Sequence, residues 1–98
     1  MDIKAFKMDG LGNDFVIIDR RKDDVSLSKE QIVKIGNRNN VGFDQIIFIE
    51  KKIDEAYPIT IFNSDGNEIS ACGNGSRCVA YLLSKQINTK EIKLKNYI

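Results

Sequence analysis

Histidine is absent from this sequence of 98 residues, and there are only two cysteines, Cys72 and Cys78. Two thiols without histidine are too few ligands for a structural zinc site, and they cannot form a dense disulfide framework. On one helix they would lie about 9 Å apart along the axis at roughly 1.5 Å per residue, beyond the roughly 7 Å limit for a disulfide. Acid–base chemistry near neutral pH must therefore use a thiol, a carboxyl group or a lysine.

Long apolar runs and an excess of either charge are also missing. No run approaches the roughly 18 to 20 apolar residues that a membrane span requires, and the first residues do not resemble a secretory signal. The 15 basic and 14 acidic residues give a net charge of +1, which provides no basic surface for nucleic acid. With 42% hydrophobic and 30% charged residues, the composition is typical of a globular domain. We expect a cytoplasmic protein that binds neither membranes nor nucleic acids.

The apolar pattern predicts short strands and few helices. Strands are expected at 3–8, 15–19, 45–50, 59–62, 68–70 and 91–95, and helices at 28–35 and 74–85. Ser28 is a good N-cap for the first helix, whereas the second helix is apolar around most of its circumference and belongs in a core. Most connections are too short for parallel crossovers. The predicted fold class is therefore α+β, with a mainly antiparallel or mixed sheet curled around a central apolar helix.

Glycine and asparagine mark two loops with unusual backbone angles. The first is the turn within residues 8–14, which holds two glycines and an Asn-Asp pair. The second covers residues 37–42, where asparagine tolerates left-handed angles.

The segment from Asn63 to Arg77 carries the most chemical information. Cys72 lies just before the predicted apolar helix, whose N-terminus would favour a thiolate. Gly73 and Gly75 would let backbone N–H groups approach an anion, such as a carboxylate or the charge that develops when a proton leaves an α-carbon. A thiolate there could be a base for that proton or a nucleophile toward a carbonyl, and the pattern leaves both open.

A cysteine in a small domain can equally be an inert, buried residue, so the pattern by itself also allows a non-catalytic Cys72. Cys78 lies on the apolar face of the predicted helix, and we interpret it as core packing.

Three blocks of the sequence resemble motifs of the diaminopimelate epimerase family. Asn63–Arg77 is similar to the signature in which an Asn-x-Asp-Gly-Ser turn is followed, after four residues, by Cys-Gly-Asn-Gly-x-Arg; Asn67 stands where the family usually has serine. Lys7–Phe15 resembles the N-terminal block of the family. Residues 40–45 resemble its Gly-Ile-Gly-x-Asp-Gln block, with Asn40 in place of the first glycine, a replacement that left-handed backbone angles permit. Three blocks in order over nearly the whole chain are far more specific than one.

The resemblance implies an isomerase that interconverts LL- and meso-diaminopimelate, in lysine and peptidoglycan precursor synthesis, without pyridoxal phosphate, another cofactor or a metal. Family members use two cysteines on opposite faces of the α-carbon: one thiolate removes the α-proton and the other thiol delivers a proton. Cys72 matches the first. The family's second cysteine lies in a second domain of similar fold, so residues 1–98 would form an N-terminal domain with little or no activity alone.

The resemblance also implies a set of substrate contacts. Gly73 and Asn74 match the residues whose backbone holds the α-carboxylate, and Asn13, Gln45 and Asn63 match residues that contact the substrate. A further group, assigned to structure, comprises Arg77 and the loop-bracing residues Asp14, Asp44 and Asp65.

The implied partners are the amino-acid substrate and the second domain. Without that domain an exposed face would favour self-association, for example as a homodimer, or a marginally stable monomer. Two other functions stay open: a proline racemase-type isomerase of the same fold, and a non-catalytic domain with an inert Cys72.

Overall fold

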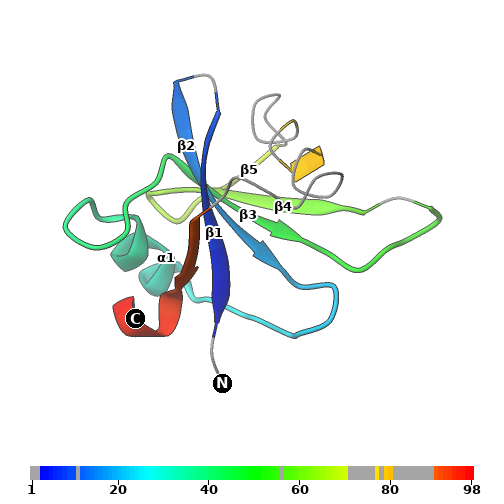
Figure 1. Ribbon diagram of the computed structural model, residues 1–98, viewed down its shortest axis with the longest axis horizontal. Helices are drawn as coiled ribbons and strands as arrows, with labels where there is room; N and C mark the ends of the chain where they lie inside the picture. Colours follow the sequence, from blue (N-terminus) through cyan, green and yellow to red (C-terminus); the bar gives the residue numbers. More distant parts are fainter. Residues whose placement is uncertain (1–2, 11, 56, 71–76, 78, 81–89) are drawn as a thin grey trace.

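The computed structural model describes residues 3–10, 12–55, 57–70, 77, 79–80 and 90–98. Within these residues, six strands form one sheet in the order β5-β4-β3-β2-β1-β6 (Figure 1). The strands are β1 (Lys4–Gly10), β2 (Asn13–Asp19), β3 (Gln45–Ile49), β4 (Ile59–Asn63), β5 (Glu68–Ile69) and β6 (Lys90–Lys93). Helix α1 (Lys29–Gly36) follows β2, and the 3-10 turn η1 (Leu94–Tyr97) follows β6.

The sheet is mixed. The pairs β1–β2, β1–β6, β3–β4 and β4–β5 are antiparallel, whereas β2 and β3 are parallel. Parallel neighbours need a long crossover, and the chain between β2 and β3 supplies one that contains α1. The predicted α+β class and mixed, mainly antiparallel sheet are confirmed.

Both faces of the sheet are apolar. The face covered by α1 and η1, which we call the first face, holds a cluster of buried side chains: Ala5, Val16, Ile18, Val25, Ile32, Ile35, Phe43, Ile46, Phe48 and Leu94. The second face holds another cluster: Met8, Phe15, Ile17, Ile47, Ile49, Ile61 and Val79. Because successive side chains point to opposite faces, the four consecutive buried residues from Phe15 to Ile18 contribute to both clusters.

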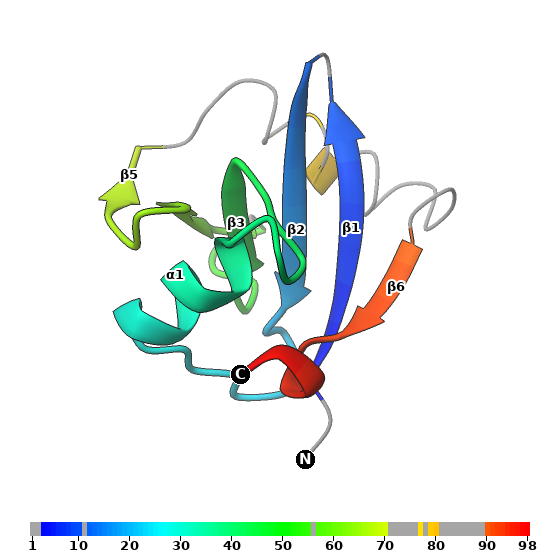
Figure 2. The same cartoon turned by 90° about the vertical axis from the view of Figure 1, so that its left-hand side faces the viewer.

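The predicted helix at 74–85 lies mostly outside the described residues. Arg77, Val79 and Ala80 are helical, and Val79 is buried in the second-face cluster. Figure 2 shows α1 and η1 in front of the sheet and this short yellow-orange helical piece behind β1 and β2. A helical segment therefore packs on the second face, while a central helix of the predicted length stays a prediction. No helix among the described residues is long and apolar enough to cross a bilayer.

Helix α1 begins where the sequence predicts. Ser28 accepts a hydrogen bond from the backbone N–H of Gln31 at 3.1 Å, and the Gln31 side chain accepts one from the backbone N–H of Ser28 at 2.8 Å. This capping box satisfies two donors that the helix itself cannot. The helix runs one residue beyond the expected end, through Gly36.

Several predicted strand boundaries are wrong, most of them by one or two residues. Residues 8–14 were expected to form a turn, but β1 continues to Gly10 and β2 begins at its partner Asn13. The reversal is this tight because Gly12 adopts a φ of +90°. The strand expected at 91–95 ends at Lys93, because Lys93 pairs with Lys4, where β1 begins.

The left-handed angle expected at Asn40 is also wrong. In the described part of the chain, the non-glycine residues with positive φ are Asp54 and Glu55. The Asn40 side-chain amide instead donates to the carbonyl oxygen of Lys34 at 2.7 Å, and Gly42 takes the left-handed position with a φ of +73°.

Candidate functional site

The strand register brings three predicted substrate-binding amides to one end of the second face. Gln45 pairs with Phe15 on β2 and with Asn63 on β4, and Phe15 belongs to the second-face cluster. Asn13 lies two residues before Phe15 and therefore points to the same face. The structure thus places Asn13, Gln45 and Asn63 on neighbouring strands at one end of the second face.

Gln45 has one amide atom bound and one unsatisfied. Its Nε2 donates to Oδ1 of Asn63 at 3.1 Å. Its Oε1 is buried and has no hydrogen-bond partner within the described part of the chain. A buried acceptor without a donor costs about 1–3 kcal/mol, so this oxygen is suited to accept a hydrogen bond from an ammonium or N–H group of a ligand.

The same strand ends carry acidic residues on the first face. The backbone N–H of Asp14 donates to Oδ2 of Asp44 at 2.9 Å. In return, the backbone N–H of Asp44 donates to the carbonyl oxygen of Asp14 and to its Oδ1, both at 3.0 Å. The interpretation of Asp14 and Asp44 as loop-bracing residues is confirmed.

Two cations balance these carboxylates. Lys7 Nζ lies 2.7 Å from Oδ2 of Asp14 and also donates to the carbonyl oxygen of Gly42. Arg38 donates to Asp14 at 2.5 and 3.1 Å and to Asp44 at 3.2 Å. The hydrogen bonds from Arg38, joined by those from Lys7, outweigh burial and hold the pKa of Asp14 well below its usual range.

A short turn after β4 positions Asn63. Its backbone N–H donates to the carbonyl oxygen of Asn67 at 2.9 Å, and its own carbonyl accepts from Gly66 at 2.9 Å. Asp65 closes the turn, because its Oδ1 accepts the backbone N–H of Asn67 at 2.9 Å. This confirms the bracing role expected of Asp65. The side chain of Asn67 also accepts a hydrogen bond from Lys29 at 3.1 Å, which ties the turn to the start of α1.

The expected thiol and its anion site are not described. Cys72, Gly73, Asn74 and Cys78 lie outside the described residues, and their roles stay predictions. Arg77 is helical with an exposed side chain. No group of three potential metal ligands occurs among the residues that the structure describes.

Sequence reasoning missed the cations, Lys7 and Arg38. Lys7 could have been found, because strand alternation places it on the same face as the adjacent part of β2, where Asp14 needs a counter-charge. Arg38 lies in a loop without periodicity, so no pattern in the sequence predicts its partners.

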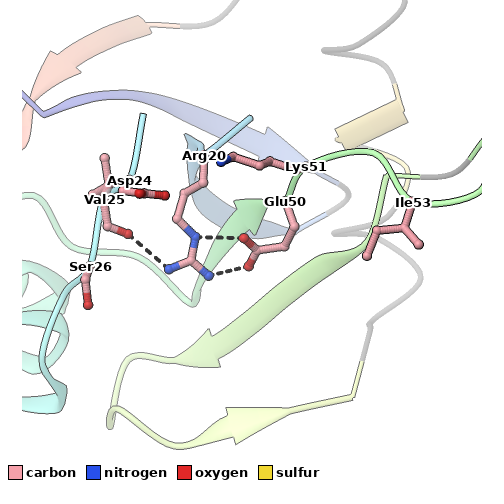
Figure 3. A pocket seen from close by; sticks show the side chains of 7 residues that line it. All are labelled: Arg20, Asp24, Val25, Ser26, Glu50, Lys51 and Ile53. Atoms are coloured by element: carbon pink, nitrogen blue, oxygen red, sulfur yellow. Dashed lines mark hydrogen bonds and ion pairs between the residues drawn. The ribbon is translucent and has the colours of Figure 1, made fainter. Parts of the chain in front are cut away.

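A second ionic cluster lies where β2 and β3 end, at the opposite end from Asn13 and Gln45. Figure 3 shows its residues Arg20, Val25 and Glu50. Arg20 forms a two-pronged pair with Glu50 and donates to the carbonyl oxygen of Val25 at 3.0 Å. Thr60 donates to Glu50 at 2.6 Å, and the Arg20 guanidinium lies 4.1 Å from the ring centroid of Phe48. Although Arg20, Val25 and Glu50 border a cavity of about 450 Å³, the guanidinium is already engaged on three sides. We therefore interpret the cluster as a clamp between β2, β3 and β4.

A protein-family model described as diaminopimelate epimerase matches residues 5–96. The chain belongs to the diaminopimelate epimerase family. A diaminopimelate epimerase from Pelagibacter ubique is 60% identical over 94 residues, which cover 96% of this chain and 34% of the relative. One from Chromobacterium violaceum is 45% identical over 89 residues, covering 88% and 32%. The chain therefore spans about a third of the length of these relatives.

Solved structures share the fold of this diaminopimelate epimerase family chain. A phenazine biosynthesis protein of the PhzF family from Bacillus anthracis superimposes with a TM-score of 0.63 at 24% identity, over 88% of this chain and 29% of that one. A PhzF family protein from Enterococcus faecalis gives a TM-score of 0.61 at 20% identity, over 92% and 35%. At these identities the likeness shows the fold alone.

The three blocks that resemble diaminopimelate epimerase motifs meet in the fold. Their described parts lie at the β1–β2 turn, at the start of β3 and at the end of β4, and Gln45 joins the second block to the third through its hydrogen bond with Asn63. Segments far apart in the sequence thus converge on one end of the sheet.

Proposed function

We propose that this chain is the N-terminal domain of a two-domain diaminopimelate epimerase. The whole enzyme interconverts LL- and meso-diaminopimelate without a cofactor, and this domain supplies Cys72 as one of two proton-transferring thiols. The observation that carries the proposal is the 60% identity to the Pelagibacter ubique diaminopimelate epimerase over 96% of the chain. The convergence of Asn13, Gln45 and Asn63 supports it.

The proposed reaction is a balanced proton transfer. The Cys72 thiolate takes the α-proton, while a thiol from the second domain gives its proton to the opposite face of the α-carbon. The electron pair of the broken C–H bond is delocalised from the α-carbon into the α-carboxylate until the second proton arrives. Backbone N–H groups of Gly73 and Asn74 stabilise the added negative charge. Because the α-proton is very weakly acidic, the site must exclude water, which requires both domains.

The three side-chain amides of Asn13, Gln45 and Asn63 suit a substrate that has an amino group and a carboxylate at each end. A carboxamide offers both a donor and an acceptor. In Gln45 the donor is bound to Asn63 and the acceptor Oε1 is unsatisfied within the described residues, so we assign this oxygen to a substrate ammonium group. Asn13 and Asn63 lie on either side of it and would contact neighbouring polar atoms.

A proline racemase-type isomerase is the alternative. The fold does not decide the substrate, since the solved structures that share it are phenazine biosynthesis proteins. The identity to diaminopimelate epimerases favours the first proposal.

The test uses a joined enzyme, in which this chain is continued by the remaining two-thirds of the Pelagibacter ubique relative. We expect it to epimerise LL-diaminopimelate and not to racemise proline. Cys72→Ala should reduce kcat/KM by about a hundred- to ten-thousandfold, the usual effect of losing a positioned base. Cys78→Ala is the matched control and should retain activity. Turnover of proline alone would favour the alternative, and full activity of Cys72→Ala would disprove the assigned role.

The chain without the second domain should be nearly inactive. Exchange of the substrate α-proton in D₂O separates two possibilities: exchange that depends on Cys72 shows a competent half-site, whereas epimerisation at the rate of the joined enzyme would contradict the two-domain proposal. We also expect self-association of the isolated chain, which gel filtration at several concentrations can detect.

A further inference from the structure

Each of the three binding amides has a chain neighbour that belongs to one hydrogen-bonded group. The neighbours of Asn13, Gln45 and Asn63 are, in that order, Asp14, Asp44 and Ser64. Asp14 and Asp44 exchange backbone and side-chain hydrogen bonds of 2.9 and 3.0 Å. The backbone N–H of Ser64 donates to the carbonyl oxygen of Asp44 at 3.2 Å. Asp44 therefore connects the three strand ends that carry the amides.

Strand alternation separates this group from the binding face. Asp14 directly follows Asn13 in β2, so its side chain points to the first face while the amide points to the second. On the first face the Asp14 carboxylate meets Lys7 from β1 and Arg38 from the loop after α1. We call Lys7, Asp14, Arg38 and Asp44 the brace. Its side chains contact the backbone of the strand ends from the first face, opposite to the direction of the amide side chains.

The brace has a charge balance of its own. Two carboxylates next to each other would repel unless cations neutralise them. Lys7 and Arg38 do so, and both are committed to the carboxylates. The Asp14 side chain is 18% exposed, whereas that of Arg38 is 59% exposed. The open cavity of about 460 Å³ at this end is lined by Gly12, Asn13, Asp14, Arg38 and Asp44. Its charged groups already pair with one another, so we assign no separate ligand site there.

We propose that Asp14 and Asp44 are positioning residues, which set the spacing of Asn13, Gln45 and Asn63 through the strand backbones and make no contact with the substrate. The inference rests on the proposed function, because it assigns a purpose to the arrangement of that site. Displacing substrate-binding groups by about 1 Å can reduce catalytic efficiency about a hundredfold, so hydrogen bonds that hold three strand ends together matter for function.

Asp14→Asn and Asp44→Asn in the joined enzyme test the proposal. Each keeps the side-chain shape and an acceptor oxygen. Asp14→Asn removes the charge that holds Lys7 and Arg38, and Asp44→Asn removes a charge that holds Arg38. We expect KM for diaminopimelate to rise about tenfold or more with a smaller change in kcat, since the displaced amides would bind ground state and transition state alike. Arg38→Met, at an exposed position, should act in the same direction, and Arg38→Lys should restore part of the loss.

Glu50→Gln is the matched control, because it removes the carboxylate of the clamp at the other end of the same strands. We expect it to lower stability and leave KM unchanged. The side-chain amide NMR signals of Asn13, Gln45 and Asn63 in the joined enzyme give a second measurement. They should shift in Asp14→Asn and stay in place in Glu50→Gln.

The outcomes separate the two proposals. An unmutated joined enzyme that does not act on diaminopimelate contradicts the proposed function, while the amide signals still test the brace. An active enzyme in which Asp14→Asn and Arg38→Met leave both KM and the amide signals unchanged overturns the positioning role, even if stability falls.

Discussion

At Gln45, binding and stability make opposite demands. Oε1, which has no hydrogen-bond partner among the described residues, lowers stability, while the bond from Nε2 to Asn63 raises it. We expect Gln45→Leu to change the free energy of unfolding by less than about 1 kcal/mol, because it removes an unpaired acceptor together with one hydrogen bond. The same substitution should abolish tight substrate binding by the joined enzyme. Urea denaturation and KM measure the two effects.

The control for Gln45→Leu is Ile47→Ala, two residues along β3 on the same face. It should lower the free energy of unfolding by about 2–5 kcal/mol, as large-to-small core substitutions do. A comparable loss in Gln45→Leu would show that its oxygen has a donor within the protein.

Both the backbone angle and the lack of space for a Cβ atom favour glycine at position 42. Its φ is +73°, and a Cβ there would lie 2.6 Å from Cδ of Arg38. Gly42→Ala should therefore lower the free energy of unfolding by about 1–3 kcal/mol and displace Arg38 from the brace. Gly12→Ala is the matched control, because Gly12 has a φ of +90° but open space around its Cβ position. Thermal unfolding should show a smaller loss for Gly12→Ala, and equal losses would exclude the contact with Arg38 as a cause.

The resemblance of the three motif blocks supplied Asn13, Gln45 and Asn63 as candidates, but the sequence did not place them on one face, because Asn13 and Asn63 lay outside the predicted strands at 15–19 and 59–62. The partners of Asp14 could not be predicted as fully. Lys7 contacts Asp14 from β1, the strand paired with β2. Arg38 contacts it from a loop whose path depends on the packing of α1 and on the backbone at Gly42. Loop geometry of this kind arises from tertiary contacts and leaves no periodic signal.

At the scale of elements, α1 is short, with eight residues, and isolated helices of this length are unstable in water. Its first turn depends on the capping box at Ser28 and Gln31. Ser28→Ala should lower the free energy of unfolding by about 1 kcal/mol, measured by urea denaturation. Ser26→Ala, two residues earlier at an exposed loop position, should have no measurable effect. Equal results for the two variants would mean that packing alone sets the start of α1.

Strand boundaries show why local patterns were insufficient at the β1–β2 turn. Asn13 and Asp14 are residues that favour turns, yet both belong to β2, because pairing with β1 and the bonds to Asp44 hold them extended. Similarly, β6 ends at the point where its partner strand begins. The ends of these strands are set by pairing with neighbouring strands. A short window of sequence does not include those partner strands.

For the whole molecule, acid should weaken the fold at both ends of the central strands. Hydrogen bonds from Arg38 hold the pKa of Asp14 down against burial. Burial raises the pKa of Glu50, but the hydrogen bonds from Arg20 and Thr60 together lower it by more, so the pKa lies below its ordinary value. A carboxylate with a lowered pKa stabilises the fold above its ordinary pKa, and this stabilisation is lost as pH falls through the folded value.

We therefore expect the urea midpoint to fall between about pH 6 and about pH 3, with most of the decrease below about pH 4.5. Asp14→Asn and Glu50→Gln should each show a smaller decrease over this interval, because each lacks one of the titrating groups. Asp23→Asn, at an exposed position, should follow the unmutated chain. A decrease that is the same in all four proteins would exclude these two carboxylates as its source.

The pairing of β1 with β6 has a consequence for synthesis on the ribosome. The residues of β1 that pair with β6 are translated more than 80 residues before their partners in Lys90–Lys93. At a typical rate of about 5–20 residues per second, the outer edge of β1 stays open for several seconds while β2, β3 and β4 are already available to assemble beside it. An open strand edge is a template for pairing with another chain, so a nascent chain stalled before residue 90 should be more prone to aggregation than one that has passed it.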